Sequence, residues 1–267
     1  MSRKVKKTLT DYGREWLDTL VVAISVAMAF RAYFYEPFKI PTGSMQKTLW
    51  GYHTEAGREK TAWDAFPLSL LKWAWTGERV VDWKAPVSGT VRCTPRNDGF
   101  ADVRIGTSPK SWSLPTDACR EIHGKFVTEG ETFWKGAIIT GDFIFVNRWK
   151  WNFVKPKTNE VMIFSTTGMA ADPNGMHAGA DGRKYLLPQG THYIKRMKAR
   201  PGETYELEHP VPDRPATVTM GDGEYFACGD NFENSYDSRY WGVVPARNLR
   251  GCASVVFWPF SGWRVIR

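Results

Sequence analysis

Seven short runs of alternating or apolar residues, each four or five residues long, dominate the second half of this 267-residue chain. Glycine, proline, asparagine and aspartate separate the runs, as they do where strands are joined by turns. The runs cover residues 143–147, 161–165, 193–197, 204–208, 217–220, 224–228 and 254–258. This pattern predicts a mostly β fold, built on an antiparallel sheet or barrel, with few helices.

The composition excludes two classes of protein. Hydrophobic residues make up 42% of the chain, charged residues 24%, and the mean hydropathy is −0.40, which fits neither a disordered chain nor a polytopic membrane protein. The thirteen tryptophans suit pleated sheets and membrane interfaces. The net charge of +8 permits an anionic lipid or a nucleic acid as a partner, and charge alone decides neither.

An apolar segment near the N-terminus predicts where the chain resides. Its uncharged part, 19–30, is only as long as the core of a signal peptide, but 16–35 reaches the length of a membrane span if Asp18 and Arg31 extend to the two interfaces. We expect an uncleaved transmembrane anchor; a removable signal peptide cut after a small residue near Ala29 is the alternative. The basic head, residues 1–15, predicts a cytoplasmic N-terminus and places the part of the chain after the span outside the cytoplasm.

The stretch 51–140 differs from the rest and is expected to be an inserted subdomain, which leaves 36–50 and 141–267 as the main β-domain. Within the insert, 61–75 is helix-like, whereas 80–91 and 101–105 resemble hairpin strands. The apolar segment 65–75 contains Pro67 and Lys72, so we expect a core or interfacial helix rather than a second span. A loop rich in glycine, alanine and aspartate, 167–190, is expected to be a mobile excursion.

The motifs of several enzyme classes are missing from the sequence. The four cysteines and five histidines do not have the spacing of paired metal ligands, so we expect no metal and no cofactor. The sequence contains no G-x-S-x-G elbow, P-loop or G-x-G-x-x-G motif. A Ser-His-Asp triad is assembled in space and stays open, although no histidine carries a supporting local signal.

Four segments together carry a resemblance. They are 40–49 (IPTGSMQKTL), 141–146 (GDFIFV), 193–196 (YIKR) with 200–203 (RPGE), and 229–242 (GDNFENSYDSRYWG). In this order, behind an N-terminal anchor, they resemble the boxes of the type I signal (leader) peptidases, which are membrane-anchored Ser/Lys proteases. The resemblance covers 17–49 and 141–260 and omits the insert.

The resemblance implies a role for individual residues. The nucleophile of the family falls on Ser44, its general base on Lys195 and its lysine-orienting serine on Ser235. Thr42 matches the residue whose hydroxyl, with the backbone N–H of Ser44, forms the oxyanion hole. The supporting ion-pair positions fall on Asp230, Asp237, Arg239 and Arg196.

Elementary chemistry agrees with these roles. A serine hydroxyl is a poor nucleophile without a base, and a lysine serves as that base only when it is neutral. Burial among apolar neighbours lowers the pKa of a lysine, because the charged form loses its hydration. Three positions depart from the family: Lys47 replaces a proline, Phe232 an arginine and Glu203 an aspartate, and these changes bear on the shape of the substrate cleft.

The implied function is removal of N-terminal signal peptides from exported preproteins at the outer face of the bacterial cytoplasmic membrane. Its partners would be the phospholipid membrane and preproteins with small residues at the first and third positions before the cut. The two shallow apolar pockets that this preference needs are expected around Phe38, Ile40, Ile144 and Ile194. The extracytoplasmic location permits disulfides, and the spacings suggest Cys93–Cys119 and Cys228–Cys252, with buried free thiols as the alternative.

Two other classes of protein stay open. A catalytically idle, membrane-anchored β-scaffold would make Ser44 and Lys195 incidental. A nucleic-acid binder could use the basic and aromatic residues of 148–151 (RWKW) as a stacking platform. We expect no nucleic-acid partner, because the predicted orientation of the anchor places this segment outside the cytoplasm.

Overall fold

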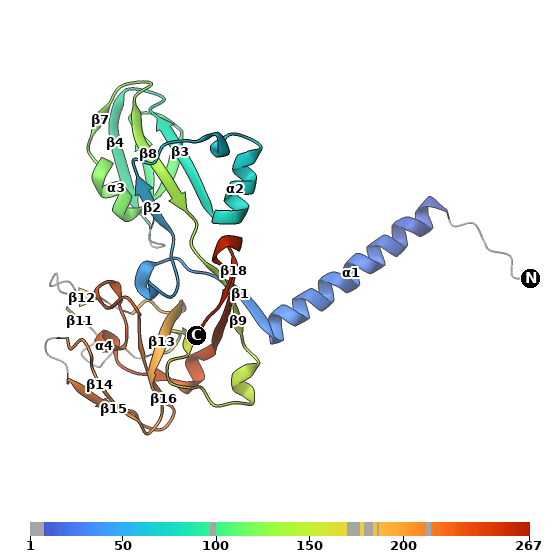
Figure 1. The fold of residues 1–267 in the computed structure, drawn as a ribbon, viewed down its shortest axis with the longest axis vertical. Coiled ribbons are helices and arrows are strands. Elements are labelled where there is room, and N and C mark those ends of the chain that lie inside the picture. The colour runs from blue at the N-terminus through green and yellow to red at the C-terminus, as the bar shows by residue number, and fades with distance from the viewer. Residues whose placement is uncertain (1–7, 97–99, 170–176, 179–183, 186, 212–214) are drawn as a thin grey trace, which may run out of the picture.

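The computed structural model describes residues 8–96, 100–169, 177–178, 184–185, 187–211 and 215–267 (Figure 1). The basic residues of 1–7 and most of the 167–190 loop therefore lie outside the described residues. Within that loop the structure has two paired two-residue strands, β11 (His177–Ala178) and β12 (Lys184–Tyr185), where the sequence predicted only loop.

The first helix, α1 (Leu9–Tyr33), projects from the rest of the molecule (Figure 1). A capping box between Thr8 and Asp11 begins it, and its 25 residues extend about 37 Å at 1.5 Å per residue. The segment Thr10–Tyr33 is long and apolar enough to cross a membrane, and none of its most apolar window is buried against the protein. The helix ends before Tyr35, which already belongs to the first strand.

The main sheet is antiparallel and confirms the predicted mostly β fold. Its strand order is β1-β9-β18-β10-β13-β16-β17, with β19 paired to β18. The strands are β1 (Tyr35–Lys39), β9 (Phe143–Asn147), β10 (Val161–Ser165), β13 (His192–Ala199), β16 (Glu224–Cys228), β17 (Val244–Pro245), β18 (Leu249–Trp258) and β19 (Arg264–Val265). A hairpin of β14 (Thr204–Glu206) and β15 (Thr217–Thr219) lies beside this sheet.

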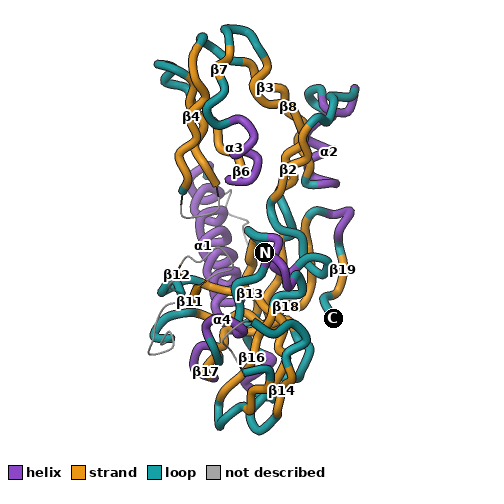
Figure 2. Tube along the Cα trace, turned by 90° about the vertical axis from the view of Figure 1, so that its left-hand side faces the viewer, coloured by secondary structure: helices purple, strands orange, loops and turns teal. Residues whose placement is uncertain are grey.

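Residues 53–139 form two further sheets, which we call the inserted unit (Figures 1 and 2). One sheet has the order β2-β8-β3 and the other β6-β5-β4-β7. Their elements are β2 (His53–Ala56), α2 (Leu68–Thr76), β3 (Glu78–Lys84), β4 (Gly89–Pro95), β5 (Phe100–Ile105), β6 (Ser111–Pro115), α3 (Thr116–Ile122), β7 (Phe126–Val127) and β8 (Thr132–Ile139). The unit has an apolar cluster of its own, centred on Trp83, Trp112, Phe133 and Trp134.

Short helices connect several strands. They are η1 (Gly43–Met45), η2 (Ala62–Asp64), η3 (Lys150–Asn152), η4 (Phe232–Asn234), α4 (Ser238–Trp241), η5 (Ala246–Asn248) and η6 (Phe260–Gly262). The helix-like stretch 61–75 is thus a 3-10 turn followed by α2, which begins directly after Pro67 because proline is accepted at the start of a helix but not inside one.

The strand β10 lies at the centre of the main sheet, and both of its faces are buried. One face packs with residues that follow β1, including Ile40, Met45 and Leu49. The other face contributes Met162 and Phe164 to a second cluster. Both faces of the main sheet are therefore covered at β10, and the turn after β1 is part of the packing.

All four cysteines are free thiols, so neither suggested disulfide is formed. Cys228 on β16 and Cys252 on β18 are separated by the two intervening strands β13 and β10. Three strand spacings amount to about 14 Å, which is beyond the reach of a disulfide. Cys93 and Cys119 are neighbours, and the Cys93 thiol donates to the Cys119 carbonyl over 3.6 Å. Spacing along the chain could not reveal this order of strands.

Candidate active site

Ser44 lies in the tight turn η1, between β1 and the inserted unit. Its neighbours fix this turn, because Ile40, Met45 and Leu49 are each at most 2% exposed and pack into the core beneath it. Ser44 itself is 9% exposed. The short polar stretch that the sequence singled out is thus held by apolar side chains on both of its flanks.

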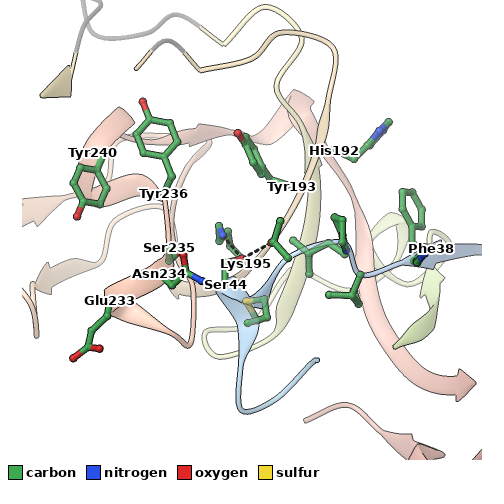
Figure 3. Close-up of a pocket in the computed structure, with 16 residues that line it drawn as sticks. Phe38, Ser44, His192, Tyr193, Lys195, Glu233, Asn234, Ser235, Tyr236 and Tyr240 are labelled. Atoms are coloured by element: carbon green, nitrogen blue, oxygen red, sulfur yellow. Dashed lines mark hydrogen bonds between the residues drawn. The ribbon is translucent and has the colours of Figure 1, made fainter. Parts of the chain in front are cut away.

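Lys195 lies on β13, 151 positions later in the chain, and the fold brings its side chain directly to Ser44. The Lys195 Nζ and the Ser44 Oγ are 2.6 Å apart (Figure 3). Lys195 is 2% exposed and follows the alternation of its strand, in which Met197 and Ala199 are buried too. The sheet therefore presents a lysine from its buried face to the serine.

Burial lowers the pKa of the Lys195 amine from 10.5 to about 8. The negative charge of Asp237 acts in the opposite direction and limits this effect. An amine with such a pKa is neutral in a large fraction of molecules slightly above neutral pH. In that form it can accept the proton of the Ser44 hydroxyl.

Thr42 and Ser235 line the same cavity as Ser44. The Thr42 hydroxyl lies 3.5 Å from the Ser44 Oγ, and Thr42 is an exposed residue. The Ser235 Oγ is buried, and among the described residues it has no hydrogen-bond partner. The expected hydrogen bond from Ser235 to the lysine amine is therefore not made in this structure, although Ser235 lines the same cavity as Lys195 (Figure 3).

Asn231, which the sequence analysis did not single out, holds the backbone of the Ser44 turn. Its N–H donates to the Ser44 carbonyl over 3.1 Å, and its side-chain amide donates to the Gly43 carbonyl over 3.2 Å. Asn231 belongs to the segment 229–242, so the only available signal was its place within that box. Two hydrogen bonds from one residue fix the turn relative to the loop after β16.

Gly229 makes room for this contact. A Cβ at position 229 would lie 2.2 Å from the Ser235 Oγ and 2.4 Å from the Ser44 carbonyl oxygen. Real Cβ atoms do not approach so closely, so only glycine allows the two loops to lie this near each other. The glycine of the G-D-N motif is thus explained by the packing of the site.

A second clamp joins Arg196, Asp230 and Thr48. The Arg196 guanidinium makes two hydrogen bonds of 2.7 Å to the Asp230 carboxylate and a third of 3.0 Å to the Thr48 hydroxyl. Because Arg196 follows Lys195, its side chain leaves the opposite face of β13. This ion pair ties the strand of the lysine to the segment after the serine.

The other expected ion pair, between Asp237 and Arg239, is buried. The Arg239 Nε donates to the Asp237 carboxylate over 2.8 Å, and the second carboxylate oxygen accepts from the Gly229 N–H over 3.0 Å. The Phe232 ring lies 5.2 Å from the Arg239 guanidinium. At the position where the family has an arginine, the ring thus gives a cation–π contact to Arg239.

Glu203 and Lys47, the other two positions that differ from the family pattern, lie outside the group of residues around Ser44 and Lys195. Glu203 pairs with Arg200 through a hydrogen bond of 2.9 Å to its Nε and also accepts from the Thr158 hydroxyl. Lys47 is exposed. Neither residue contacts Ser44 or Lys195 through any interaction that the structure assigns to the described residues.

A cavity of about 690 Å³ opens onto the serine and the lysine. Three of the four expected subsite residues, Phe38, Ile40 and Ile194, line it. Ile144 does not line the cavity, because its side chain leaves β9 on the inner side and is completely buried in the core. The cavity is also lined by aromatic side chains that the sequence analysis missed, namely Tyr193, Tyr236 and Tyr240 (Figure 3).

One histidine, His192, lies among the residues that line the described cavity. In the described part of the chain, no group of three or more His, Cys, Asp or Glu side chains could hold a metal ion. His192 lines the cavity, but its ring packs against Phe38 at 5.6 Å between centroids. The polar partner of the Ser44 hydroxyl on the buried side is Lys195.

Three residues of the RWKW segment, Arg148, Trp149 and Lys150, have partners within the protein. Arg148 pairs with Glu36 at 3.4 Å, and Lys150 pairs with Glu160. The Trp149 ring stacks on Phe34 at 4.7 Å, next to the end of α1. The two cations thus have partners within the protein.

Comparison with known proteins places the chain in a family. The family model described as "Signal peptidase, peptidase S26" matches residues 207–258. A protein of Buchnera aphidicola subsp. Acyrthosiphon pisum named Signal peptidase I is 58% identical over 242 residues, which is 86% of this chain and 70% of that protein. The Signal peptidase I of Pseudomonas aeruginosa is 27% identical over 94% of this chain and 74% of its own length.

Other relatives match over shorter stretches. The Probable signal peptidase I-2 of Synechocystis sp. is 31% identical over 124 residues, and the chain spans 56% of that protein's length. This chain also spans 65% of the length of the Probable signal peptidase I-1 from the same organism. With the long match to the Buchnera protein, the relationship is clear: the chain belongs to the signal peptidase I family.

Proposed function

We propose that this chain is a membrane-anchored serine endopeptidase that removes signal peptides from exported preproteins, with Ser44 as its nucleophile and Lys195 as its general base. The observation that carries the proposal is the 2.6 Å contact between the Lys195 Nζ and the Ser44 Oγ, made by a buried lysine at the edge of an open cavity. Family membership supports the same reaction.

The proposed reaction begins when the neutral Lys195 amine takes the proton of the Ser44 hydroxyl. The serine oxygen attacks the scissile carbonyl carbon, and the resulting oxyanion accepts hydrogen bonds from the Thr42 hydroxyl and the Ser44 backbone N–H. The Lys195 ammonium then gives its proton to the leaving amine, so that the mature protein departs and an acyl-enzyme stays on Ser44. A water molecule then gives a proton to Lys195 and attacks the acyl carbon. The bond to the Ser44 oxygen breaks, this oxygen takes the proton back from the Lys195 ammonium, and the signal peptide leaves with a new C-terminal carboxylate.

Five further residues would position this pair. Ser235, whose hydroxyl lacks another partner among the described residues, is free to turn towards the lysine amine when substrate closes the site. The pairs Arg196–Asp230 and Asp237–Arg239 support the strand and loops around it.

The substrate would bind in the cavity beside β1. The apolar walls given by Phe38, Ile40 and Ile194 suit small side chains at the first and third positions before the cut. The experiment compares a model preprotein carrying alanine at the first position with one carrying tryptophan there, with the cut identified by sequencing the new N-terminus. We expect cleavage of the first alone; equal cleavage of both would contradict the proposed substrate class.

The proposed location is the cytoplasmic membrane of a bacterium, with the N-terminus inside and the cavity outside. It rests on α1, which is long enough to cross the bilayer, and on the basic residues that precede it. A reporter fused after residue 150 should be active only if it functions outside the cytoplasm. Activity of a cytoplasm-specific reporter at this position would reverse the orientation.

A further inference from the structure

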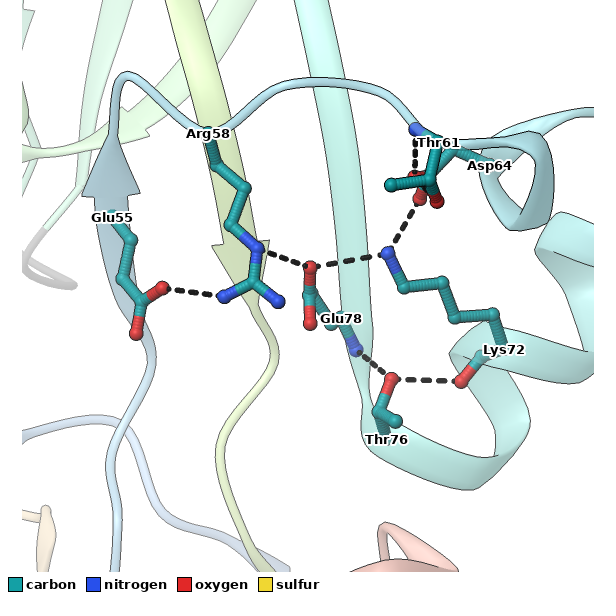
Figure 4. A network of polar contacts seen from close by, with 7 residues as sticks. All are labelled: Glu55, Arg58, Thr61, Asp64, Lys72, Thr76 and Glu78. Carbon is teal, nitrogen blue, oxygen red and sulfur yellow. Dashed lines mark hydrogen bonds and ion pairs between the residues drawn. The ribbon is translucent and has the colours of Figure 1, made fainter.

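The helix α2 of the inserted unit turns polar side chains towards the protein and apolar side chains away from it. Its one charged residue, Lys72, lies on the inner side and donates to Asp64 over 2.7 Å and to Glu78 over 3.2 Å (Figure 4). The Asp64 and Lys72 side chains are only 4% and 15% exposed. An amphipathic helix of a soluble domain normally has the reverse arrangement.

The polar network continues beyond the helix and fastens it to two strands. Arg58, which follows β2, pairs with Glu78 at 3.3 Å and with Glu55 at 3.0 Å (Figure 4). The Thr76 hydroxyl accepts from the Glu78 N–H and donates to the carbonyl of Lys72. The polar side chains on the inner face of α2 therefore have hydrogen-bond partners in the protein. A rotation that turned the apolar side chains inwards would break these hydrogen bonds.

One aromatic contact joins α2 to the main sheet. The Trp73 ring lies 5.1 Å from the ring of Trp258 at the end of β18. Gly77, which ends the helix in a left-handed conformation, packs closely against Trp258 and Pro259. The helix thus bridges the inserted unit and the part of the molecule that carries the cavity.

The part of α2 that faces away from the polar network, together with the turn before it, exposes five large apolar side chains, which we call the α2 surface. Their exposed fractions lie between 57% and 82%, and they are Trp63, Phe66, Leu70, Leu71 and Trp75. The segment from Ala65 to Leu71 contains no charged residue. Groups of this kind rarely gather on a surface that faces only water.

The composition of this surface and its place in the fold favour a lipid bilayer as its partner. Tryptophan and phenylalanine suit the headgroup region, where one part of the ring is in an apolar medium and another is hydrated. The helix α2, which carries most of this surface, lies on the side of the molecule from which α1 projects (Figure 1). Since α1 joins β1 directly, a bilayer crossed by α1 lies close to that side.

We propose that the α2 surface rests in the headgroup region of the same bilayer that α1 crosses, so that the inserted unit contacts the membrane at a second place. This contact would prevent the part of the protein outside the membrane from rotating about the axis of α1. A single spanning helix allows that rotation, whereas two separate points of attachment do not. The proposal does not depend on the chemistry assigned to Ser44.

The test places a photoreactive benzoylphenylalanine at position 71 of the full chain, reconstituted at one molecule per lipid nanodisc. Position 24, in the middle of α1, is the positive control. Position 129 is the negative control, because Glu129 is exposed and lies near the end of β3 that is farther from α2, about 20 Å away. Irradiation followed by mass spectrometry identifies what each position has bonded to.

We expect a lipid adduct at positions 71 and 24 and none at position 129. If position 24 gives the adduct and position 71 behaves like position 129, the proposal is wrong. In a second preparation with two chains per disc, a protein–protein adduct from position 71 in place of the lipid adduct would overturn it in favour of a second copy as the partner.

A variant tests the apolar character of the contact. For this test the photoreactive group is at position 66. Leu71→Glu should lower the ratio of membrane-bound to unbound α2 about 10- to 100-fold, because the free energy of transferring a leucine side chain out of water corresponds to a change of this size. Leu71→Met, which keeps the surface apolar, should leave the lipid adduct in place. Equal adduct yields from both variants would contradict a lipid contact.

Discussion

The catalytic account depends at the residue scale on the protonation of one amine. Burial lowers the pKa of Lys195 to about 8, and only the neutral amine accepts the serine proton. The rate should therefore rise with pH through about 8 and level off above it, since the neutral fraction grows as pH exceeds the pKa. The dependence of kcat/KM on pH for a soluble peptide substrate measures this rise.

Two variants test whether Lys195 or His192 is the base that causes this pH dependence. Lys195→Arg should be inactive, because a guanidinium does not lose its proton in this range. His192→Gln should keep the rise unchanged, although His192 lines the same cavity. A rise that disappears in His192→Gln would transfer the role of base to the histidine.

Thr42 gives a second prediction at this scale. Its hydroxyl lies 3.5 Å from the Ser44 Oγ, and Thr42 lines the cavity in which we propose that the oxyanion forms. Thr42→Val removes the donor with little change of shape and should lower kcat about 10²–10³-fold with KM nearly unchanged. Thr42→Ser is the matched control and should keep most of the activity. If valine serves as well as threonine, the hydroxyl does not bind the oxyanion.

At the scale of elements, the site depends on two loops that approach each other closely. A Cβ at Gly229 would lie 2.4 Å from the Ser44 carbonyl oxygen, so Gly229→Ala should displace the Ser44 turn and remove most of the activity. The control is Gly221→Ala, whose new Cβ would meet only the flexible Glu224 carboxylate. Both variants should be assayed for cleavage and for their unfolding midpoint. Equal activities would mean that the turn tolerates a shift.

The loop after β16 is also held by the buried pair Asp237–Arg239. Asp237→Asn leaves the Arg239 charge without its partner, which costs about 3–5 kcal/mol and lowers the unfolding midpoint by on the order of 10 °C. Removing the Asp237 charge should also move the pH dependence of cleavage to lower pH, because that charge raises the pKa of Lys195. Glu59→Gln, which removes an exposed pair with Lys135, is the control and should change neither quantity. An unchanged midpoint in Asp237→Asn would show that the pair does not stabilise the loop.

Across the whole molecule, local patterns could predict strands but not their order. The runs 143–147, 161–165 and 224–228 coincide with β9, β10 and β16, because apolar alternation between turn residues is a local signal. The strand order places β10 and β13 between Cys228 and Cys252, which no spacing along the chain reveals. The suggested disulfide between them was wrong for that reason.

Sequence could predict the candidate site only through the resemblance. Ser44 and Lys195 are 151 residues apart, and neither has a local signature of catalysis. Alternation along β9 did not say which face lines the cavity, so Ile144 was placed there although it is buried in the core. The segment 65–75 left a core and an interfacial helix open, and the exposure of Leu71 excludes the core position.

The most direct measurement of the central claim is the cleavage rate of the purified full chain with Ser44→Ala. Ser111→Ala, an exposed serine of the inserted unit, is the matched control. The account predicts that Ser44→Ala folds and inserts like the wild type but cleaves a model preprotein about 10⁴-fold more slowly or worse, while Ser111→Ala keeps full activity. Cleavage by Ser44→Ala at a rate near that of the wild type would contradict the assignment of Ser44 as the nucleophile.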